Sequence, residues 1–284
     1  MQVGFQEGVF ALNYPYKTGI QLNSVRSDLA RDFEGTLASL AEMGYEGVEF
    51  AGLYGKKPEE AKALCAKYRL EPISAHVALE EMLADPDGVF AACKQIGCSY
   101  IAVPYLTEDR RPLRENYEET IGQIEALTKK AKTHGLDMLF HNHYFEFVRL
   151  PGGKYGYDDL FSRIPDIGAE IDTCWVNVAG EDPCTYLNLY AERIPLVHFK
   201  DFMMLGTNDE NRGCMTFKDG KPYVDFSSFE YRPLGYGAQD VPKMISALDG
   251  SVCTWIIVEQ DEPSMGKNRM ECAKMSIDYL KSLK

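Results

Sequence analysis

Residues 116–143 read NYEETIGQIEALTKKAKTHGLDMLFHNH, and they contain one complete helix-to-strand unit. Apolar residues return every three or four positions up to Gly135, which is typical of an amphipathic helix that ends at a glycine. The next run, 136–140, is apolar apart from Asp137, as expected for a buried strand. His141 and His143 end this strand. Two imidazoles so close together are not expected in an apolar core. The unit therefore predicts both a buried strand and a functional strand end.

The same alternation of strand and helix runs along the whole chain. Strands are expected at 3–5, 45–52, 70–77, 98–106, 136–143, 166–175, 195–201 and 251–261. Helices are expected at 32–44, 57–69, 85–97, 116–135, 158–164, 183–194, 241–250 and 268–284. Eight such units without a Gly-rich dinucleotide signature predict an α/β fold of the (β/α)8 TIM barrel type, with a doubly wound open sheet as the alternative.

One stretch departs from this regular pattern. Residues 205–232 are polar, lie between the seventh and eighth expected strands, and contain KDGK, a hairpin-turn signal. We expect an inserted hairpin or lid here, within a single barrel domain that covers residues 1–284.

Composition limits the classes of partner. The chain has 284 residues and a formal net charge of −13, whereas nucleic-acid binders need a basic stripe to neutralise phosphates. No apolar run approaches the ~20 residues of a membrane span, and no basic-then-apolar leader opens the sequence. None of the eight cysteines forms a CxxC pair, which favours reduced thiols. These features predict a cytoplasmic protein without a nucleic-acid or membrane partner.

Ionisable residues gather where the expected strands end. They are Glu49, His76, His141, His143, Asp172, His198, Glu259 and Asp261, and they include four of the five histidines. Functional side chains of a TIM barrel lie at the carboxyl ends of its strands, and residues two apart on a strand share a side. A mixed set of imidazoles and carboxylates suits Mn²⁺, Zn²⁺, Co²⁺ or Fe²⁺ better than Ca²⁺. For Glu49 and His76 a purely structural role is an equal alternative, and His134 is expected to be only a helix-terminal cation.

Three segments carry a family resemblance. GAEIDTCWVNVAGEDP (168–183), PLVHFKDF (195–202) and WIIVEQDEP (255–263), together with the Gly-x-Gly turn in RPLGYGAQDVPKMISAL (232–248), resemble the sugar phosphate isomerase/epimerase-like superfamily of xylose isomerase-like TIM barrels, in particular its inosose dehydratase-type branch. The resemblance implies one divalent metal ion, Mn²⁺ first, that is held by groups from strands five to eight.

The metal ligands that the resemblance implies are Asp172, His198, Glu259 and a strand-five residue. Many relatives have a glutamate at the strand-five position, where this chain has His141. Either His141 is the ligand, which we favour, or Glu146 reaches the metal from the following loop. In the first case Glu146 resembles a glutamate that contacts the sugar in epimerases of the family.

The resemblance also implies a reaction class. We expect a metal-dependent isomerase, epimerase or dehydratase that removes the proton next to a metal-bound carbonyl of a keto-sugar or keto-polyol. Glu259 is the first candidate base, with His143 or Glu146 opposite it as acid. Lys200 either holds a developing oxyanion or forms a structural salt bridge with Asp201 or another carboxylate.

Two departures from the epimerases favour the dehydratase branch. The epimerases have a histidine three residues after the strand-six aspartate, where this chain has Trp175, and an arginine after the strand-seven histidine, where this chain reads HFKDF. Expected substrate contacts are Glu49, His76, Asp261 and Trp175, the last by stacking on a sugar or cyclitol ring.

Other functions remain as alternatives. One is a β-eliminating lyase that acts on 3-keto-glycosides or inosose. More remote are a non-catalytic sugar-binding relative and an abasic-site endonuclease, which needs more histidines and a basic face. The expected partner is a small sugar or cyclitol, and a homo-oligomer is left open.

Overall fold

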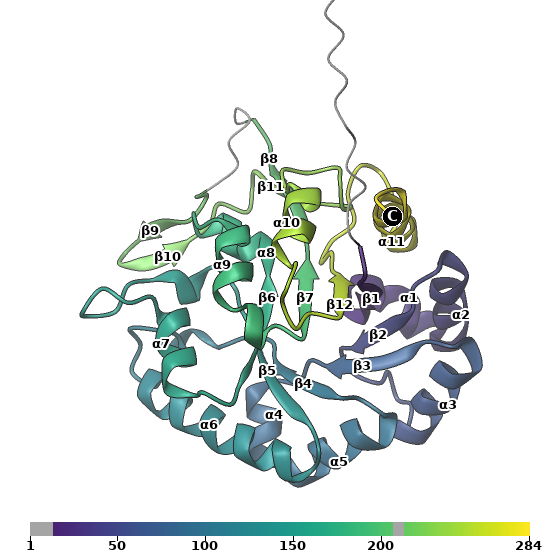
Figure 1. Cartoon of the computed structure of the whole chain (residues 1–284), viewed down its shortest axis with the longest axis horizontal. Coiled ribbons are helices and arrows are strands. Elements are labelled where there is room, and N and C mark those ends of the chain that lie inside the picture. The colour runs from purple at the N-terminus through teal and green to yellow at the C-terminus, as the bar shows by residue number, and fades with distance from the viewer. Residues whose placement is uncertain (1–13, 207–212) are drawn as a thin grey trace, which may run out of the picture.

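Eight parallel strands close into a barrel that is surrounded by helices (Figure 1). The computed structural model describes residues 14–206 and 213–284. The barrel strands are β1 (Lys17–Gln21), β2 (Gly47–Phe50), β3 (Glu71–Ala75), β4 (Tyr100–Val103), β5 (Asp137–His141), β6 (Gly168–Asp172), β7 (Leu196–Phe199) and β12 (Trp255–Val258). They are paired in the order β3-β2-β1-β12-β7-β6-β5-β4, and a parallel bridge between His76 and Ala102 closes the ring. The predicted TIM barrel is confirmed, and the open sheet is excluded.

The first barrel strand is not where the sequence pattern placed it. The expected strand at 3–5 lies outside the described residues, and β1 instead spans Lys17–Gln21, between β2 and β12. Gly19 explains why its pattern is weak. A Cβ at this position would lie 2.6 Å from Ile73 Cδ1 and 2.8 Å from Ile257 Cδ1. The tight interior of the barrel therefore requires a glycine where a strand pattern would show a large apolar residue.

All eight expected helices are present, and three further short ones, α1, α4 and α8, were not expected because six residues carry little periodic signal. The helices are α1 (Arg26–Arg31), α2 (Phe33–Met43), α3 (Pro58–Tyr68), α4 (Leu79–Ala84), α5 (Pro86–Ile96), α6 (Tyr117–Thr133), α7 (Gly156–Arg163), α8 (Thr173–Val178), α9 (Pro183–Leu189), α10 (Val241–Ala247) and α11 (Arg269–Ser282). Single turns of 3-10 helix occur at η1 (Leu22–Val25), η2 (Glu108–Arg110), η3 (Phe145–Phe147) and η4 (Ala191–Arg193). No helix in the described ranges is long and apolar enough to cross a bilayer.

The expected insertion consists of two small antiparallel pairs between β7 and β12. In one, β8 (Asp201–Met204) pairs with β11 (Phe229–Arg232), so the insertion begins slightly earlier than predicted. In the other, β9 (Thr216–Lys218) and β10 (Lys221–Tyr223) form a hairpin around Asp219 and Gly220, whose φ angles are +52° and +71°. Positive φ at both central residues is what the KDGK signal requires. The hairpin is confirmed, and its role as a lid remains a prediction.

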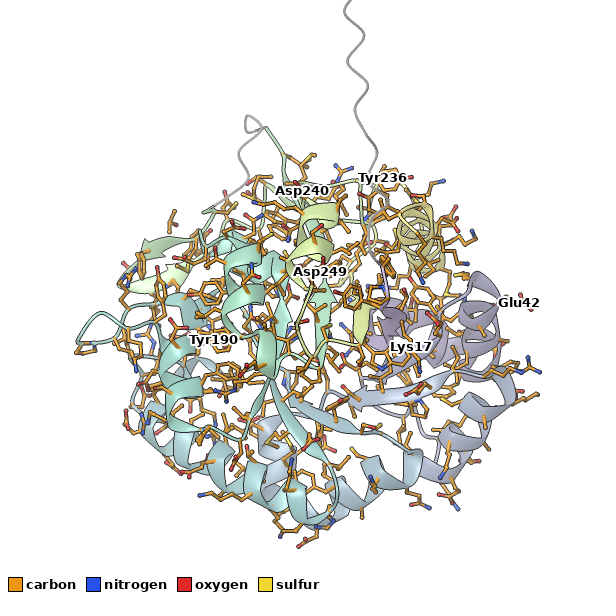
Figure 2. The ribbon with its side chains drawn as sticks, in the orientation of Figure 1. Lys17, Glu42, Tyr190, Tyr236, Asp240 and Asp249 are labelled. Carbon is orange, nitrogen blue, oxygen red and sulfur yellow. The ribbon has the colours of Figure 1, made fainter. Side chains whose placement is uncertain are left out.

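The barrel interior has an apolar floor beneath a polar layer. Buried side chains form a cluster separate from the main core between strands and helices; they are Ile73, Ala102, Leu139, Leu196, Trp255 and Ile257. Leu139 and Ile257 each precede an ionisable residue, His141 and Glu259, by two positions on the same face. Figure 2 shows how densely side chains fill the space between the strands and the surrounding helices. The floor therefore supports the polar strand ends from below.

Candidate functional site

A layer of ionisable side chains crosses the carboxyl end of the barrel. Eight of them are at most 9% exposed, namely Glu49, His76, His141, Glu170, Asp172, His198, Lys200 and Glu259. Burying so many charges is costly unless each is paired or binds a cation. Two groups of four have ligand atoms within 4.8 Å of one another. We call His141, Asp172, His198 and Glu259 the rim set, and His76, His141, Glu170 and His198 the deep set.

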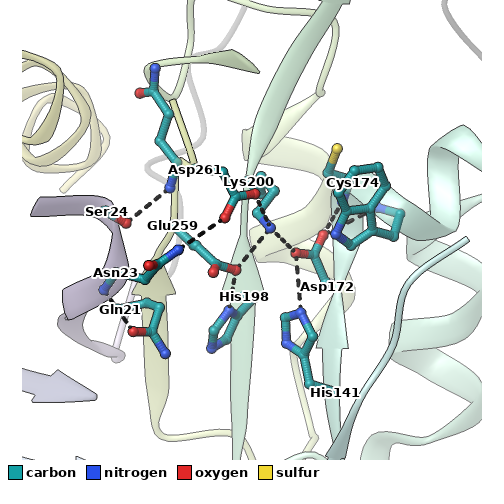
Figure 3. Close-up of polar contacts among 12 residues, drawn as sticks. Gln21, Asn23, Ser24, His141, Asp172, Cys174, His198, Lys200, Glu259 and Asp261 are labelled. Carbon is teal, nitrogen blue, oxygen red and sulfur yellow. Dashed lines mark hydrogen bonds and ion pairs between the residues drawn. The ribbon is translucent and has the colours of Figure 1, made fainter. Parts of the chain in front are cut away.

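The rim set contains the four residues that the sequence suggested as metal ligands. In Figure 3, His141 Nε2 lies 3.8 Å from Asp172 Oδ2, and His198 Nδ1 forms a 2.9 Å hydrogen bond with Glu259 Oε2. Asp172 Oδ2 is buried and faces the Lys200 ammonium, at 3.1 Å, as well as His141. Two imidazoles and two carboxylates in this arrangement are a ligand set suited to a divalent transition ion.

Asp172 is held by the start of α8. Its Oδ1 accepts hydrogen bonds from Cys174 N at 2.8 Å and Trp175 N at 3.1 Å, which makes Asp172 the N-cap of that helix. Asn142 bonds both the N–H and the carbonyl of Asp172, at 2.9 and 3.2 Å, and ties the end of β5 to the end of β6. The remaining oxygen, Oδ2, therefore faces His141 and Lys200 in a fixed direction.

Lys200 is a buried cation beside the rim set. Its Nζ lies 2.9 Å from Glu259 Oε2, 3.1 Å from Asp172 Oδ2 and 3.0 Å from Asp261 Oδ2. Burial opposes the charge, but these carboxylates hold the pKa of Lys200 well above its usual value. Burial also raises the pKa of Asp172, whereas Lys200 and His198 overcome burial at Glu259 and hold its pKa well below the usual range.

The deep set shares His141 and His198 with the rim set. It has His76 and Glu170 in place of Asp172 and Glu259, and Glu170 stands two residues before Asp172 on β6. His76 Nε2 is 2.7 Å from Glu170 Oε2 and 3.0 Å from Glu49 Oε1, and His198 Nε2 is 2.8 Å from Glu49 Oε1. Burial opposes protonation, yet Glu49 and Glu170 raise the pKa of His76 to about 10. Glu49 is also hydrogen-bonded by Gln21 and Ser74. Glu49 and His76, which we expected to contact substrate, thus lie below the rim, against each other and His198.

Glu170 was missed from the sequence, although a signal for it existed. It precedes Asp172 by two residues on β6, so the two side chains point to the same side of the strand. Gln21 was missed because β1 was not recognised. Ser74 belongs to no sequence motif. Only its hydrogen bond to Glu49 in the folded structure identifies it as part of the ionisable layer.

His143 and Glu146 form the next part of the site, in the loop after β5. His143 is half-buried, its Nδ1 has no hydrogen-bond partner among the described residues, and burial holds its pKa well below the usual value. Its ring stacks on Phe145 and Trp175, with centroids 5.2 and 5.4 Å away. Glu146 Oε2 accepts a 2.8 Å hydrogen bond from His143 N, and burial raises the pKa of Glu146 to about 8. Glu146 belongs to neither ligand set.

Trp175 and Asp261 border the same space. Trp175 is 3% exposed and is stacked against His143 and Phe229, so little of its ring surface is open. The Lys200 ammonium lies 5.2 Å from its ring centroid, which is a cation–π contact. Asp261 has a side chain that is 27% exposed and links Lys200 to the solvent side. Asp261 is thus the more exposed of these two residues.

Comparison with known proteins identifies the family and similar folds. A family model described as "Xylose isomerase-like TIM barrel" matches residues 37–283. The inosose dehydratase of Lacticaseibacillus casei is 24% identical over 87% of this chain and 88% of its own. A sugar phosphate isomerase/epimerase from Parabacteroides distasonis has the same fold, with a TM-score of 0.70 and 19% identity over 99% of this chain and 98% of that one. The IolI protein, solved with a zinc atom, has a TM-score of 0.69 and 13% identity over 94% and 97% of the two chains.

Proposed function

The chain belongs to the xylose isomerase-like TIM barrel family, and we propose that it is a divalent-metal-dependent enzyme that removes the proton beside the carbonyl of a keto-sugar or keto-polyol. Among the reactions open to such a site, we favour dehydration of a cyclic keto-polyol. The observation that carries the proposal is the rim set, in which two imidazoles and two carboxylates converge beside a buried lysine. The naming of the L. casei relative as an inosose dehydratase supports the choice of reaction.

His141, Asp172, His198 and Glu259 would hold the ion. When bound, a divalent cation polarises the carbonyl of the substrate and acidifies the adjacent C–H. The residues fit such a group because two imidazoles and two carboxylates present buried ligand atoms within 4.8 Å of one another. Charge balance also supports it, since the two sets and Glu49 bring four buried carboxylates together beside one lysine. Mn²⁺, Zn²⁺, Co²⁺ and Fe²⁺ all suit this donor set.

The structure leads us to revise the candidate base. Glu259 Oε2 lies 2.9 Å from both Lys200 Nζ and His198 Nδ1, so this oxygen is already engaged by two neighbours. We therefore assign Glu259 to ion binding alone. His143 is better placed for proton transfer because its Nδ1 has no hydrogen-bond partner among the described residues and its ring lies beside His141, with centroids 5.4 Å apart. Burial lowers the pKa of His143, which leaves the imidazole unprotonated and able to accept a proton. Trp175 then serves as a support for the His143 ring.

Lys200 supplies the positive charge for the oxyanion that develops when the proton leaves. In dehydration, His143 takes the proton from carbon and returns it to the departing β-hydroxyl, so that water leaves and a double bond forms. If the proton returns to carbon instead, the outcome is isomerisation or epimerisation, and if an alkoxyl leaves, it is cleavage of a 3-keto-glycoside. Glu146 holds the His143 backbone in place through its 2.8 Å hydrogen bond.

The test is proton exchange in D₂O. Metal-loaded protein is incubated with inososes, ketohexoses and 3-keto-glycosides, and mass spectrometry follows deuterium uptake, loss of water and release of an alcohol. Chelator-stripped protein is the control. We expect metal-dependent loss of water from a cyclic keto-polyol. Absence of exchange and product with every compound, in protein shown to contain metal, would leave only a non-catalytic sugar-binding role.

A further inference from the structure

The deep set forms a second converging group beneath the rim set. We propose that His76, His141, Glu170 and His198 form a second seat for a divalent transition ion, of the Zn²⁺ or Co²⁺ type. This inference goes beyond the proposed function and does not depend on it. It assigns a binding role to Glu170, which the catalytic proposal leaves unused.

Spacing is the first support. Glu170 Oε2 lies 2.7 Å from His76 Nε2 and 3.6 Å from His141 Nδ1, and Glu170 Oε1 lies 3.3 Å from His198 Nε2. Ligand atoms at the corners of a tetrahedron around Zn²⁺, each about 2.0–2.1 Å from the metal, stand roughly 3.3 Å apart. The measured separations bracket that value, so small rotations of the side chains would complete the seat.

An incompletely paired nitrogen is the second support. His141 Nδ1 is buried and forms no hydrogen bond within the described residues, and Glu170 Oε2 lies 3.6 Å from it. A buried polar atom without a partner costs about 1–3 kcal/mol. The other two atoms of the group face each other, since Glu170 Oε1 lies 3.3 Å from His198 Nε2, which is also 2.8 Å from Glu49 Oε1. A metal cation would accept the lone pair of His141 Nδ1 together with that of the facing carboxylate.

Charge is the third support. Within the described ranges, the ion pairs of Glu49 and Glu170 are all with histidines. The buried lysine, Lys200, pairs instead with the rim carboxylates and Asp261. The deep carboxylates therefore have only histidines as cationic partners, and a divalent ion among them would take the place of protons on those imidazoles.

The two seats share ligands and so exclude each other. His141 faces Asp172 with Nε2 and Glu170 with Nδ1, and His198 faces Glu259 with Nδ1 and Glu170 with Nε2. A neutral imidazole has one lone pair, so an ion in one seat leaves N–H groups pointing into the other. We therefore expect one ion per chain. The three nitrogens of the deep seat favour Zn²⁺ or Co²⁺, whereas the two carboxylates of the rim seat suit Mn²⁺ better.

The test removes the rim seat and asks whether the ion stays. In the full chain, Asp172→Asn combined with Glu259→Gln removes both rim carboxylates and leaves every deep ligand. Chelator-stripped protein is titrated with Co²⁺, and bound metal is counted by elemental analysis. We expect one Co²⁺ per chain with the intense visible absorption of four-coordinate cobalt, and none after the addition of Glu170→Gln.

If the Asp172→Asn, Glu259→Gln double variant binds no Co²⁺, the proposal is overturned. The deep set would then be a network of carboxylates paired with protonated histidines. Circular dichroism without metal checks that each variant is folded. If the double variant does not fold, Glu259→Gln alone, compared with Glu259→Gln plus Glu170→Gln, gives the same contrast. The result is independent of the proposed function, because deuterium exchange by the native protein is measured separately.

Discussion

Lys200 and Asp172 form an ion pair, Nζ to Oδ2 at 3.1 Å, in which neither residue is more than 1% exposed. The carboxylate oxygen that faces the ammonium is the one that would face a metal ion. Lys200 and the ion therefore share carboxylates, and the ammonium repels the ion while it stabilises the metal-free layer. This double role can be separated experimentally.

Replacement of Lys200 by methionine should have opposite effects on metal binding and on metal-free stability. Breaking a buried pair leaves uncompensated charge and costs about 3–5 kcal/mol, so the metal-free variant should unfold at a lower denaturant concentration. Its affinity for Mn²⁺ should rise, and its deuterium exchange should fall. Denaturation and competition with a fluorescent chelator measure the two quantities. Lys129→Met, at an exposed helical pair with Glu125, should change neither, and a loss of Mn²⁺ affinity in Lys200→Met would refute the shared-carboxylate account.

The barrel could be predicted from the sequence because most of its strands are short apolar runs that end in polar residues. β1 is the exception. Its residues, KTGIQ, include only one large apolar side chain, and Gly19 is required by the approach of Ile73 and Ile257. A strand whose inner face is a glycine has no periodic signal, although parallel pairing with β2 and β12 makes it indispensable.

The convergence of the rim set could also be predicted, because parallel strands end at the same side of a barrel. The depth of Glu49 and His76 in the barrel, below the rim set, could not be predicted from the sequence. The pairing of β2 with β3 shifts register between Val48 and Glu49, so that Glu49 stands opposite Ser74. A single irregularity of this kind decides which polar side chains meet and which stay below the rim, and no sequence pattern marks it.

Loss of His198 should abolish tight metal binding altogether, because His198 belongs to both ligand sets. We expect His198→Ala, after purification in Mn²⁺ or Zn²⁺, to contain less than a tenth of the metal of the native protein. His134→Ala is the matched control, since His134 belongs to neither ligand set and forms an exposed pair with Asp87. Full occupancy in His198→Ala would mean that neither set holds the ion.

His143→Gln should separate chemistry from metal binding. Loss of a general base lowers rates by about 10²–10⁴-fold, so exchange should fall by at least 100-fold while metal content stays native. Glu146→Gln, which keeps an oxygen acceptor for His143 N, should retain most of the exchange. Normal exchange in His143→Gln would return the role of base to another residue, with Glu259 first in line.

Asp201 should be essential for the loop that follows β11. Its carboxylate is buried and accepts backbone hydrogen bonds of 2.9–3.1 Å from Phe202, Gly235, Gly237 and Gln239. Asp201→Asn turns one of the two oxygens into a donor that faces N–H groups, and the loss of the two hydrogen bonds that this oxygen accepts should cost about 2–4 kcal/mol. Urea denaturation measures the loss. Asp225→Asn, at an exposed position, should stay within about 0.5 kcal/mol of the native protein, and equal stability of the two variants would contradict the assignment.

Glu146 should make stability fall as pH rises. Burial raises the pKa of Glu146 from 4.5 to about 8, so the folded protein holds this proton across a range in which the unfolded chain has lost it. The contribution of Glu146 to the free energy of unfolding is fully present below pH 4.5. It declines between pH 4.5 and 8 by about 1.4 kcal/mol per pH unit, so that above pH 8 the free energy of unfolding is about 4–5 kcal/mol lower than below pH 4.5.

Glu146→Gln removes this titration while it keeps the size of the side chain and an acceptor for His143 N. The difference in unfolding free energy between the variant and the native protein should therefore grow in favour of the variant from pH 5 to pH 8, because the other titrating groups are common to both. Thermal and urea unfolding at half-unit pH intervals measures that difference. A difference that is constant across this range would mean that Glu146 is ionised in the folded protein, with a cation or water beside its unpartnered Oε1.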